Sequence, residues 1–326
     1  MPQILWKLLF AVSSWRLSPG WFSFRRLRLI AKQVAITAAG AFACASVRAD
    51  DYVFQAGTNS AAATDSRGGL FDWLDTKSAY NQEFFPQPLL VDDTSLEKEG
   101  ELEFSSLHTQ ANGQRSDTVT AEIQKSIGLL TLELTVPYER EADAGDVSQG
   151  IGNIDFGARY PVHQFVSATG FFDNTFGVGM EAGIPASSAI SVNAELQPKI
   201  FDDLKVGEQF SIQSVLGYST LLGGGDNGGQ QTFEYGFAFA YALPHAKLPL
   251  PGVQQFTPML ELAGETGLNK EESGENSLLG SLGFRADLKP IGNLQPSLGL
   301  GWVFPIDNGA HAEVHWGIVA SLIFEF

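Results

Sequence analysis

Residues 314–326, which end the chain, alternate between large apolar side chains and small or polar ones. One face of an extended chain would carry Val314, Trp316, Ile318, Ala320, Leu322, Phe324 and Phe326. A period of two is typical of a β-strand. Soluble sheets protect their exposed edges with charge or proline, so an aromatic end has no evident role there. We interpret this strand as the closing strand of a bacterial outer-membrane barrel, with Phe324 and Phe326 as the assembly signal; a strand of a soluble sandwich is the alternative.

Alternating segments recur from Gly100 to the end of the chain, with turn residues between them. We predict twelve strands: 100–110, 116–126, 129–139, 151–162, 172–184, 191–201, 208–220, 231–243, 254–267, 276–287, 293–304 and 313–326. The segment 231–243 is the clearest, because its alternate residues are aromatic: Phe233, Tyr235, Phe237, Phe239 and Tyr241. In a membrane barrel this face would contact lipid, and the small or polar face would line the lumen.

An even number of strands would place both ends of the barrel on the periplasmic side. Aromatic residues with a polar edge lie near strand ends, as expected at the two membrane interfaces. Those predicted near the outer interface are Tyr138, Tyr218, Trp302 and Trp316, and those near the inner one are Tyr160 and Tyr241. Four prolines fall inside predicted strands, where bulges, strand ends or misplaced boundaries are expected: Pro137, Pro198, Pro258 and Pro296.

After the leader, the chain has no run of 18 or more apolar residues, so the sequence predicts no helical membrane span. Only helices and closed barrels satisfy the backbone in lipid. The predicted fold is therefore all-β: a transmembrane antiparallel up-and-down β-barrel of about twelve strands over residues 100–326, with an N-terminal periplasmic extension.

Residues 1–49 are basic and contain no acidic residue, and an apolar run covers residues 34–45. A small-residue site then ends at Ala49, which predicts a secretory signal peptide cleaved there. Lipid attachment at Cys44 is the competing interpretation. Cys44 is the single cysteine, so a mature chain that begins after Ala49 would have no disulfide and no cysteine-based metal or redox site.

Charge changes the list of partners. Seven of the 20 basic residues precede Ala49, so the mature part would hold 13 basic against 37 acidic residues, a formal charge of −24. This surface repels nucleic acid, and we expect no nucleic-acid partner. The expected partners are outer-membrane lipid, the barrel-assembly machinery and an unidentified small solute.

Residues 50–99 differ from the rest, with a short apolar pattern near Trp73 and an acidic stretch at Asp92 and Asp93. The segment could be a plug or a periplasmic docking element. A partly ordered tail is the simpler interpretation.

The polar faces of the predicted strands supply charged candidates for the lumen lining: Glu122, Glu133, Asp155, Arg159, Glu181, Glu195, Lys199 and Arg285. Carboxylates outnumber bases, so a wet lumen would favour cations. The alternative is a closed interior in which the three bases pair with neighbouring acids.

The sequence contains no motif that indicates a catalytic or metal-binding site. A lipase site needs a serine activated by an oriented histidine, and none of the five histidines lies in a recognisable setting. The glycine-rich segment 223–229 lacks the features of a phosphate or calcium loop, and the acidic loop from Glu139 to Asp146 has the pattern of a solvated charge run. We predict no enzyme activity, no metal and no cofactor.

Residues 132–138 (LELTVPY), followed after an acidic loop by residues 150–160 (GIGNIDFGARY), resemble a known family, as does the Gly-rich strand 176–185. It is the group of Gram-negative outer-membrane proteins named for the meta-pathway of phenol degradation. The resemblance covers residues 100–326 loosely. It implies an outer-membrane barrel with a transport role for phenol-like compounds, and it transfers no functional residue.

The leading hypothesis is a channel or transporter in the outer membrane of a Gram-negative bacterium, for passive passage of small solutes that could include aromatic compounds. The second hypothesis is a closed structural or partner-docking barrel. A lipid hydrolase is a distant third.

Overall fold

The computed structural model describes residues 85–94, 100–127, 129–143, 145–169, 171–223, 227–270 and 272–326. The expected signal peptide with its cleavage site at Ala49 lies outside the described residues, as do residues 50–84 and 95–99 of the N-terminal extension.

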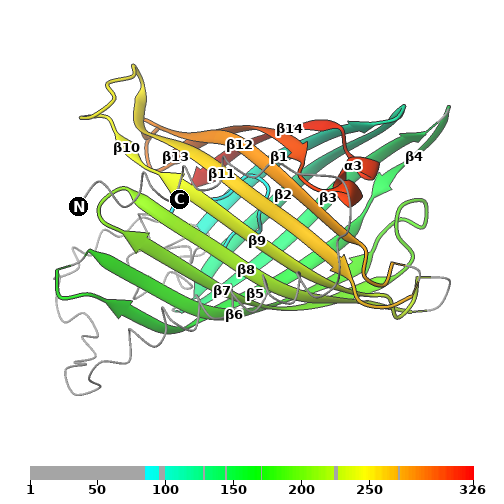
Figure 1. Ribbon diagram of the computed structural model, residues 1–326. Coiled ribbons are helices and arrows are strands. Elements are labelled where there is room, and N and C mark those ends of the chain that lie inside the picture. Colours follow the sequence, from blue (N-terminus) through cyan, green and yellow to red (C-terminus); the bar gives the residue numbers. More distant parts are fainter. Residues whose placement is uncertain are drawn as a thin grey trace, which may run out of the picture. The chain divides into compact units, whose positions relative to one another are not determined.

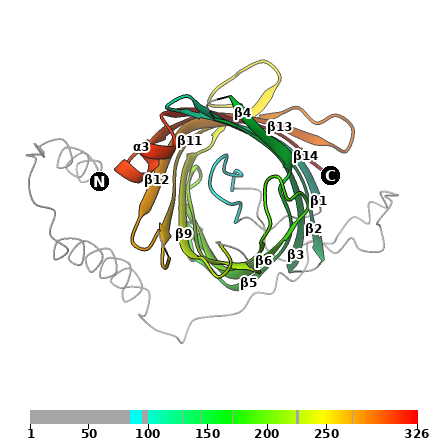
Figure 2. The ribbon, with the colours of Figure 1, turned by 90° about the vertical axis from the view of Figure 1, so that its right-hand side faces the viewer.

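Twelve long antiparallel strands close into a barrel (Figures 1 and 2). They are β1 (Gly100–Ala111), β2 (Gln114–Ile127), β3 (Leu130–Asp143), β5 (Asn153–Val166), β6 (Phe172–Pro185), β7 (Ala194–Val206), β8 (Phe210–Leu222), β9 (Gln231–Tyr241), β11 (Val253–Gly267), β12 (Asn276–Leu288), β13 (Gln295–Pro305) and β14 (Trp316–Glu325). Each overlaps one predicted segment. The ring closes where β1 pairs with β14, from Glu101 opposite Glu325 to Gln110 opposite Trp316. The predicted barrel is confirmed.

Two short strands extend the rims. β4 (Asp146–Ile151) pairs only with the outer part of β3, and β10 (Leu243–Pro244) pairs with the start of β11. Both ends of the barrel lie at the same rim, because β1 begins there and β14 ends there. The loops after β3, β8 and β11 lie at the opposite rim.

The two faces of each strand differ in the way that the alternation predicts. In β14, Trp316 and Ile318 are exposed on the outside, whereas Val319, Ser321 and Ile323 are buried toward the interior. In β9 the aromatic residues are exposed or half-buried, and the small residues between them are buried. An apolar outer face around the whole ring is the surface of a barrel embedded in lipid, since water would penalise it.

The six aromatic residues that were predicted at the two interfaces are all exposed on the barrel: Tyr138, Tyr160, Tyr218, Tyr241, Trp302 and Trp316. Near Trp316, the outward surface becomes charged. Arg115 Nε donates to Asp117 at 2.8 Å, Arg140 lies 3.3 Å from the same carboxylate, and the His108 ring contacts both Asp117 and the indole of Trp316. Such a cluster suits the headgroup level rather than the hydrocarbon.

The start of the last strand was predicted too early. Residues Asn308–Glu313 form the short helix α3, and Val314 follows it as a buried C-cap rather than facing outward. The Asp307 side chain caps α3 by accepting from the Ala310 N–H at 2.9 Å. Burial alone would raise the pKa of the Asp307 carboxyl. The hydrogen bonds that the carboxyl accepts lower the pKa by more than burial raises it, so the pKa lies below its usual value. Among the described residues, no helix is long and apolar enough to cross a membrane.

Each of the four strand prolines lies where the ladder with one neighbouring strand is interrupted or ends. Proline has no N–H to donate, so it is tolerated at such positions. At Pro137, β3 exchanges β5 for β4 as its partner. At Pro198, the pairing of β7 with β8 has a gap. Pro258 directly precedes the ladder between β11 and β9, and Pro296 directly precedes the ladder between β13 and β12.

We predict that removal of Phe326 lowers insertion into the outer membrane without lowering export. The Phe326 N–H donates to the Gly100 carbonyl at 3.0 Å, and its ring is exposed at the seam between β14 and β1. The deletion would remove only the outermost contact of the seam and the aromatic end. The measurement is the amount of heat-modifiable, folded protein in outer-membrane fractions. Equal amounts with and without Phe326 would exclude an assembly role for this residue.

Candidate functional site

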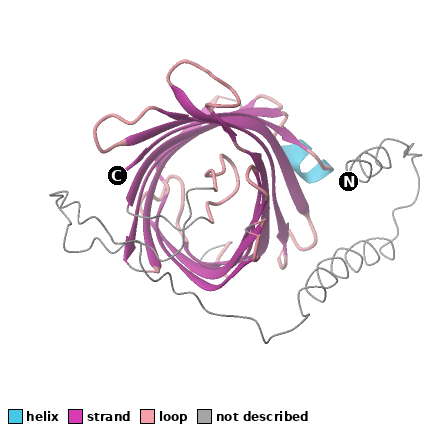
Figure 3. Cartoon of the chain, turned by 90° about the vertical axis from the view of Figure 1, so that its left-hand side faces the viewer, coloured by secondary structure: helices cyan, strands magenta, loops and turns pink. Residues whose placement is uncertain are grey.

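The interior of the barrel is occupied by residues 85–94, here called the inner segment. Figures 2 and 3 show it inside the ring of strands, with wall on every side. Phe85, Gln87, Val91 and Thr94 are buried. The site is therefore the contact between the inner segment and the inward face of the wall.

Glu261 of β11 holds the middle of the inner segment. Its carboxylate accepts three consecutive backbone hydrogen bonds, from Leu89 at 2.9 Å, Leu90 at 2.6 Å and Val91 at 3.2 Å. The Glu261 side chain has no exposed surface. Consecutive N–H groups that converge in this way form an anion-binding nest, and charge-assisted bonds of this type are stronger than neutral ones.

Wall side chains also bind the carbonyls of the proline-containing part. Arg285 of β12 donates to the Gln87 carbonyl at 2.8 Å and to the Pro88 carbonyl at 3.0 Å. Gln213 of β8 donates to the Pro86 carbonyl at 2.6 Å. Proline has no N–H and fixes its φ angle, so this stretch stays extended and offers acceptors.

Glycines of the wall make room for the apolar side chains of the inner segment. A Cβ atom at Gly299 would lie 2.4 Å from Leu89, and one at Gly283 would lie 2.7 Å from it. A Cβ atom at Gly236 would lie 2.5 Å from Val91. A larger residue at any of these positions would force the side chain of Leu89 or Val91 to shift.

The acidic end of the inner segment takes up the remaining bases. Lys199 lies 2.7 Å from Asp92 and also binds Glu181. Arg159 lies 3.2 Å from the Asp93 carboxylate and donates to the Asp93 carbonyl. At the end of the segment, the Thr94 hydroxyl donates to the buried Asp203.

The structure places the predicted lumen candidates on the inward face, but in three different settings. Arg159, Lys199 and Arg285 contact the inner segment directly. Glu181 and Glu133 lie beside the first two bases, with 3.7 Å between Glu133 and Arg159. The remaining acids lie among polar neighbours: Glu122 beside Gln124 and Thr135, Glu195 beside Ser219, and Asp155 opposite Thr135 and Gly183.

Sequence reasoning missed Asp203 and Gln213. The predicted strand 191–201 ends before Asp203, whereas β7 continues to Val206, so Asp203 was not assigned a face. The inward phase of β8 was readable from Ser211 and Gln213, which alternate with Phe210 and Ile212.

The charge balance of the interior is negative. Besides the acids already named, Glu234 of β9 accepts from Gln197, and Glu265 of β11 faces inward near it. Arg159, Lys199 and Arg285 are engaged with the inner segment and its neighbours. Carboxylates that do not lie beside these bases, among them Glu195, Glu234 and Glu265, contribute to a negative potential in the remaining space.

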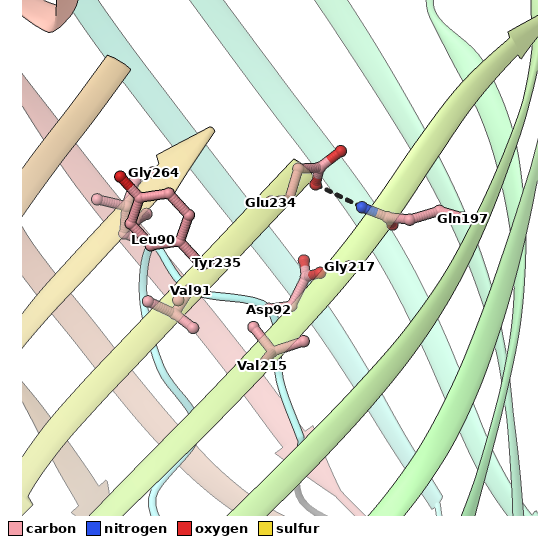
Figure 4. Close-up of a pocket in the computed structure, with 11 residues that line it drawn as sticks. Leu90, Val91, Asp92, Gln197, Val215, Gly217, Glu234, Tyr235 and Gly264 are labelled. Carbon is pink, nitrogen blue, oxygen red and sulfur yellow. Dashed lines mark hydrogen bonds between the residues drawn. The ribbon is translucent and has the colours of Figure 1, made fainter. Parts of the chain in front are cut away.

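A cavity of about 100 Å³ remains between the inner segment and the wall formed by β8, β9 and β11 (Figure 4). Leu90, Val91 and Val215 provide apolar lining, while Asp92 and Glu234 provide carboxylates. The cavity is not fully enclosed.

No group of three or more metal-ligating side chains occurs within the part of the chain that the structure describes. His108 lies on the outward surface against Asp117 and Trp316, and His245 contacts a backbone carbonyl in the loop before β11. Neither is oriented toward a serine by the contacts that it makes.

No family model and no curated protein sequence matches the chain. The chain is similar to several solved structures. The COG4313 outer membrane channel from Pseudomonas putida F1 is 14% identical, with 70% of this chain and 94% of that chain covered and a TM-score of 0.49. The NanC porin is 8% identical, with 69% and 98% covered and a TM-score of 0.44. The translocator domain of autotransporter NalP from Neisseria meningitidis is 12% identical, with 69% and 85% covered and a TM-score of 0.34. At these identities and TM-scores, the matches identify neither a family nor a solute.

Proposed function

We propose that the protein is an outer-membrane channel that passes small solutes passively through a lumen narrowed by the inner segment. The observation that carries the proposal is the contrast between an apolar outer face and a polar, charged interior. The inner segment is held there by hydrogen bonds and ion pairs, and a cavity remains beside it.

The proposed selectivity is for cations and positively charged solutes. The inward bases are engaged, so the free lumen carries the field of the carboxylates. The resemblance to the family named for phenol degradation extends the proposal to aromatic compounds, as solutes that could share the path. Outer-membrane lipid and the barrel-assembly machinery are the proposed partners of folding, in a Gram-negative cell.

The competing proposal is a closed structural or partner-docking barrel. It is favoured by the number of buried contacts around the inner segment, with Glu261 and Arg285 almost fully shielded. The two proposals differ in one measurable property, which is ion conductance across a planar bilayer.

The test of cation preference is the reversal potential of the refolded protein in an asymmetric salt gradient. Glu195→Gln and Glu234→Gln together should move it toward zero, because each substitution removes a carboxylate that accepts from a neutral donor rather than a base. Glu133 and Glu181 are poorer choices, since they lie beside Arg159 and Lys199. The wild-type selectivity should also fade as salt rises. An unchanged reversal potential would remove these carboxylates from the path, and no conductance at all would favour the closed barrel.

A further inference from the structure

The cavity beside the inner segment has two chemically different sides. Val91 and Val215 form a buried apolar cluster with Ala238, and Ala263 packs against it. Asp92 and Glu234 line the same cavity (Figure 4), and their carboxylates interact electrostatically. A ligand that fills the cavity must therefore offer an apolar body and a polar or charged end.

The charged end is expected to be positive. Glu234 interacts electrostatically with Asp92, Glu195 and Glu265, and these groups carry the same charge. Lys199 is the base of this region, and it is shared between Asp92 and Glu181. An added cation would relieve repulsion between the carboxylates, whereas an anion would increase it.

The size of the cavity limits the apolar body. The free space is about 100 Å³, and engineered apolar cavities of roughly 150 Å³ hold benzene. A short alkyl chain fits this space, with its charged end toward the carboxylates of Asp92 and Glu234 that line the cavity. Space exists partly because Gly217 has no side chain; a Cβ atom there would lie 3.2 Å from Gln197.

We propose that this cavity is a binding site for small organic cations, with a primary ammonium between Asp92 and Glu234 and a short alkyl group against Val91 and Val215. The site deepens the proposed channel function, on which its physiological role rests. A solute held there during passage would be selected for both charge and apolar character, a combination that the diffuse field of the lumen does not select.

The test uses n-butylammonium chloride and the refolded full chain in detergent micelles, with binding followed by ligand-observed NMR. n-Butanol and sodium butyrate serve as the neutral and anionic probes of the same length. n-Butylammonium should bind, and both other probes should bind at least about tenfold more weakly, as expected when a charge-assisted contact is lost.

Two variants separate the site from the general field. Glu234→Gln should weaken n-butylammonium binding about tenfold, and Gly217→Leu should abolish it by filling the space. Glu265→Gln is the matched control, because Glu265 lies opposite Glu234 on the next strand but does not line the cavity; it should leave affinity within about twofold. Folding of each variant is checked by heat-modifiable migration.

Three outcomes would overturn the site: no binding of n-butylammonium, equal binding of n-butanol, or equal weakening by Glu265→Gln and Glu234→Gln. Conductance of the same wild-type sample distinguishes the site from the function. A conducting protein that does not bind the probe would reject the site and leave the channel intact. A binding protein without conductance would support the site and reject the channel.

Discussion

Phe237→Arg should prevent efficient folding of the barrel into a bilayer. Phe237 lies on the outward face of β9, between Ser214 of β8 and Leu262 of β11. An arginine on the lipid face near the middle of the membrane costs about 2–4 kcal/mol, because its charge has neither water nor a partner there. That loss is a large part of the stability of an ordinary domain. The measurement is the urea midpoint of folding into lipid vesicles, together with the heat-modifiable fraction.

The matched control for this substitution is Glu265→Arg, on the inward face of the neighbouring strand. Glu265 is exposed and lies near other carboxylates, so an arginine there gains partners and should change the urea midpoint little. Ala238, which is adjacent to Phe237 and faces inward, is not a suitable control because its side chain is 1% exposed and packs against Val91. An arginine at Ala238 would collide with the inner segment. Equal tolerance of Phe237→Arg and Glu265→Arg would contradict the membrane assignment of the outer face.

The barrel was predictable because the alternation of apolar and polar residues that marks each strand lies within that strand's own sequence. In β9, alternate aromatic residues show both the strand and its lipid face, and the same period repeats in β14. Boundaries were less predictable, because they depend on contacts between segments distant in sequence. The helix α3 begins where Asp307 caps it and also binds the Leu278 N–H, a contact from another strand. β3 extends beyond its pairing with β5 because its outer part pairs with β4. No pattern within the sequence of β3 indicates this extension.

The site was predictable only in part, for a related reason. The inward position of Arg159, Lys199 and Arg285 follows from the phase of their strands, which the sequence carries. Their partners do not follow from that phase. Arg285 binds two backbone carbonyls from residues nearly 200 positions earlier, at a separation of 198 for Gln87. The sequence of the inner segment, with its prolines and acids, is equally compatible with a tail outside the barrel.

Glycines in the wall are the signal that could have been used. Gly299 and Gly301 of β13 alternate with large outward residues, so a stripe without side chains faces the interior. In a narrow barrel, an inward stripe of this kind indicates that something else fills the space. Here Leu89 fills it.

Replacement of residues 85–94 by a flexible Gly-Ser stretch of equal length should raise the single-channel conductance roughly severalfold, since ion flow is limited by the narrowest part of a pore. The strand ladder, including the seam between β1 and β14, does not use the inner segment, so the barrel should still fold and migrate as heat-modifiable protein. Recordings in planar bilayers, at several salt concentrations, measure the effect. Unchanged conductance would show that the path does not pass the inner segment.

Glu261→Ala is the more sensitive version of this experiment, because it changes one wall residue and keeps the inner segment. The substitution leaves the N–H groups of Leu89, Leu90 and Val91 without their acceptor inside the barrel. Each unsatisfied buried group costs about 1–3 kcal/mol, so the inner segment should leave its position more often. We expect brief openings to a higher conductance, with a larger open fraction than in wild type.

Glu265→Ala removes a carboxylate from the same strand that does not hold the inner segment, and it should show no such openings. The same openings in both variants would mean that charge alone controls the lumen. If neither Glu261→Ala nor the Gly-Ser replacement conducts, the protein is a closed structural barrel, because removal of the one element that fills the described lumen would then have opened no path.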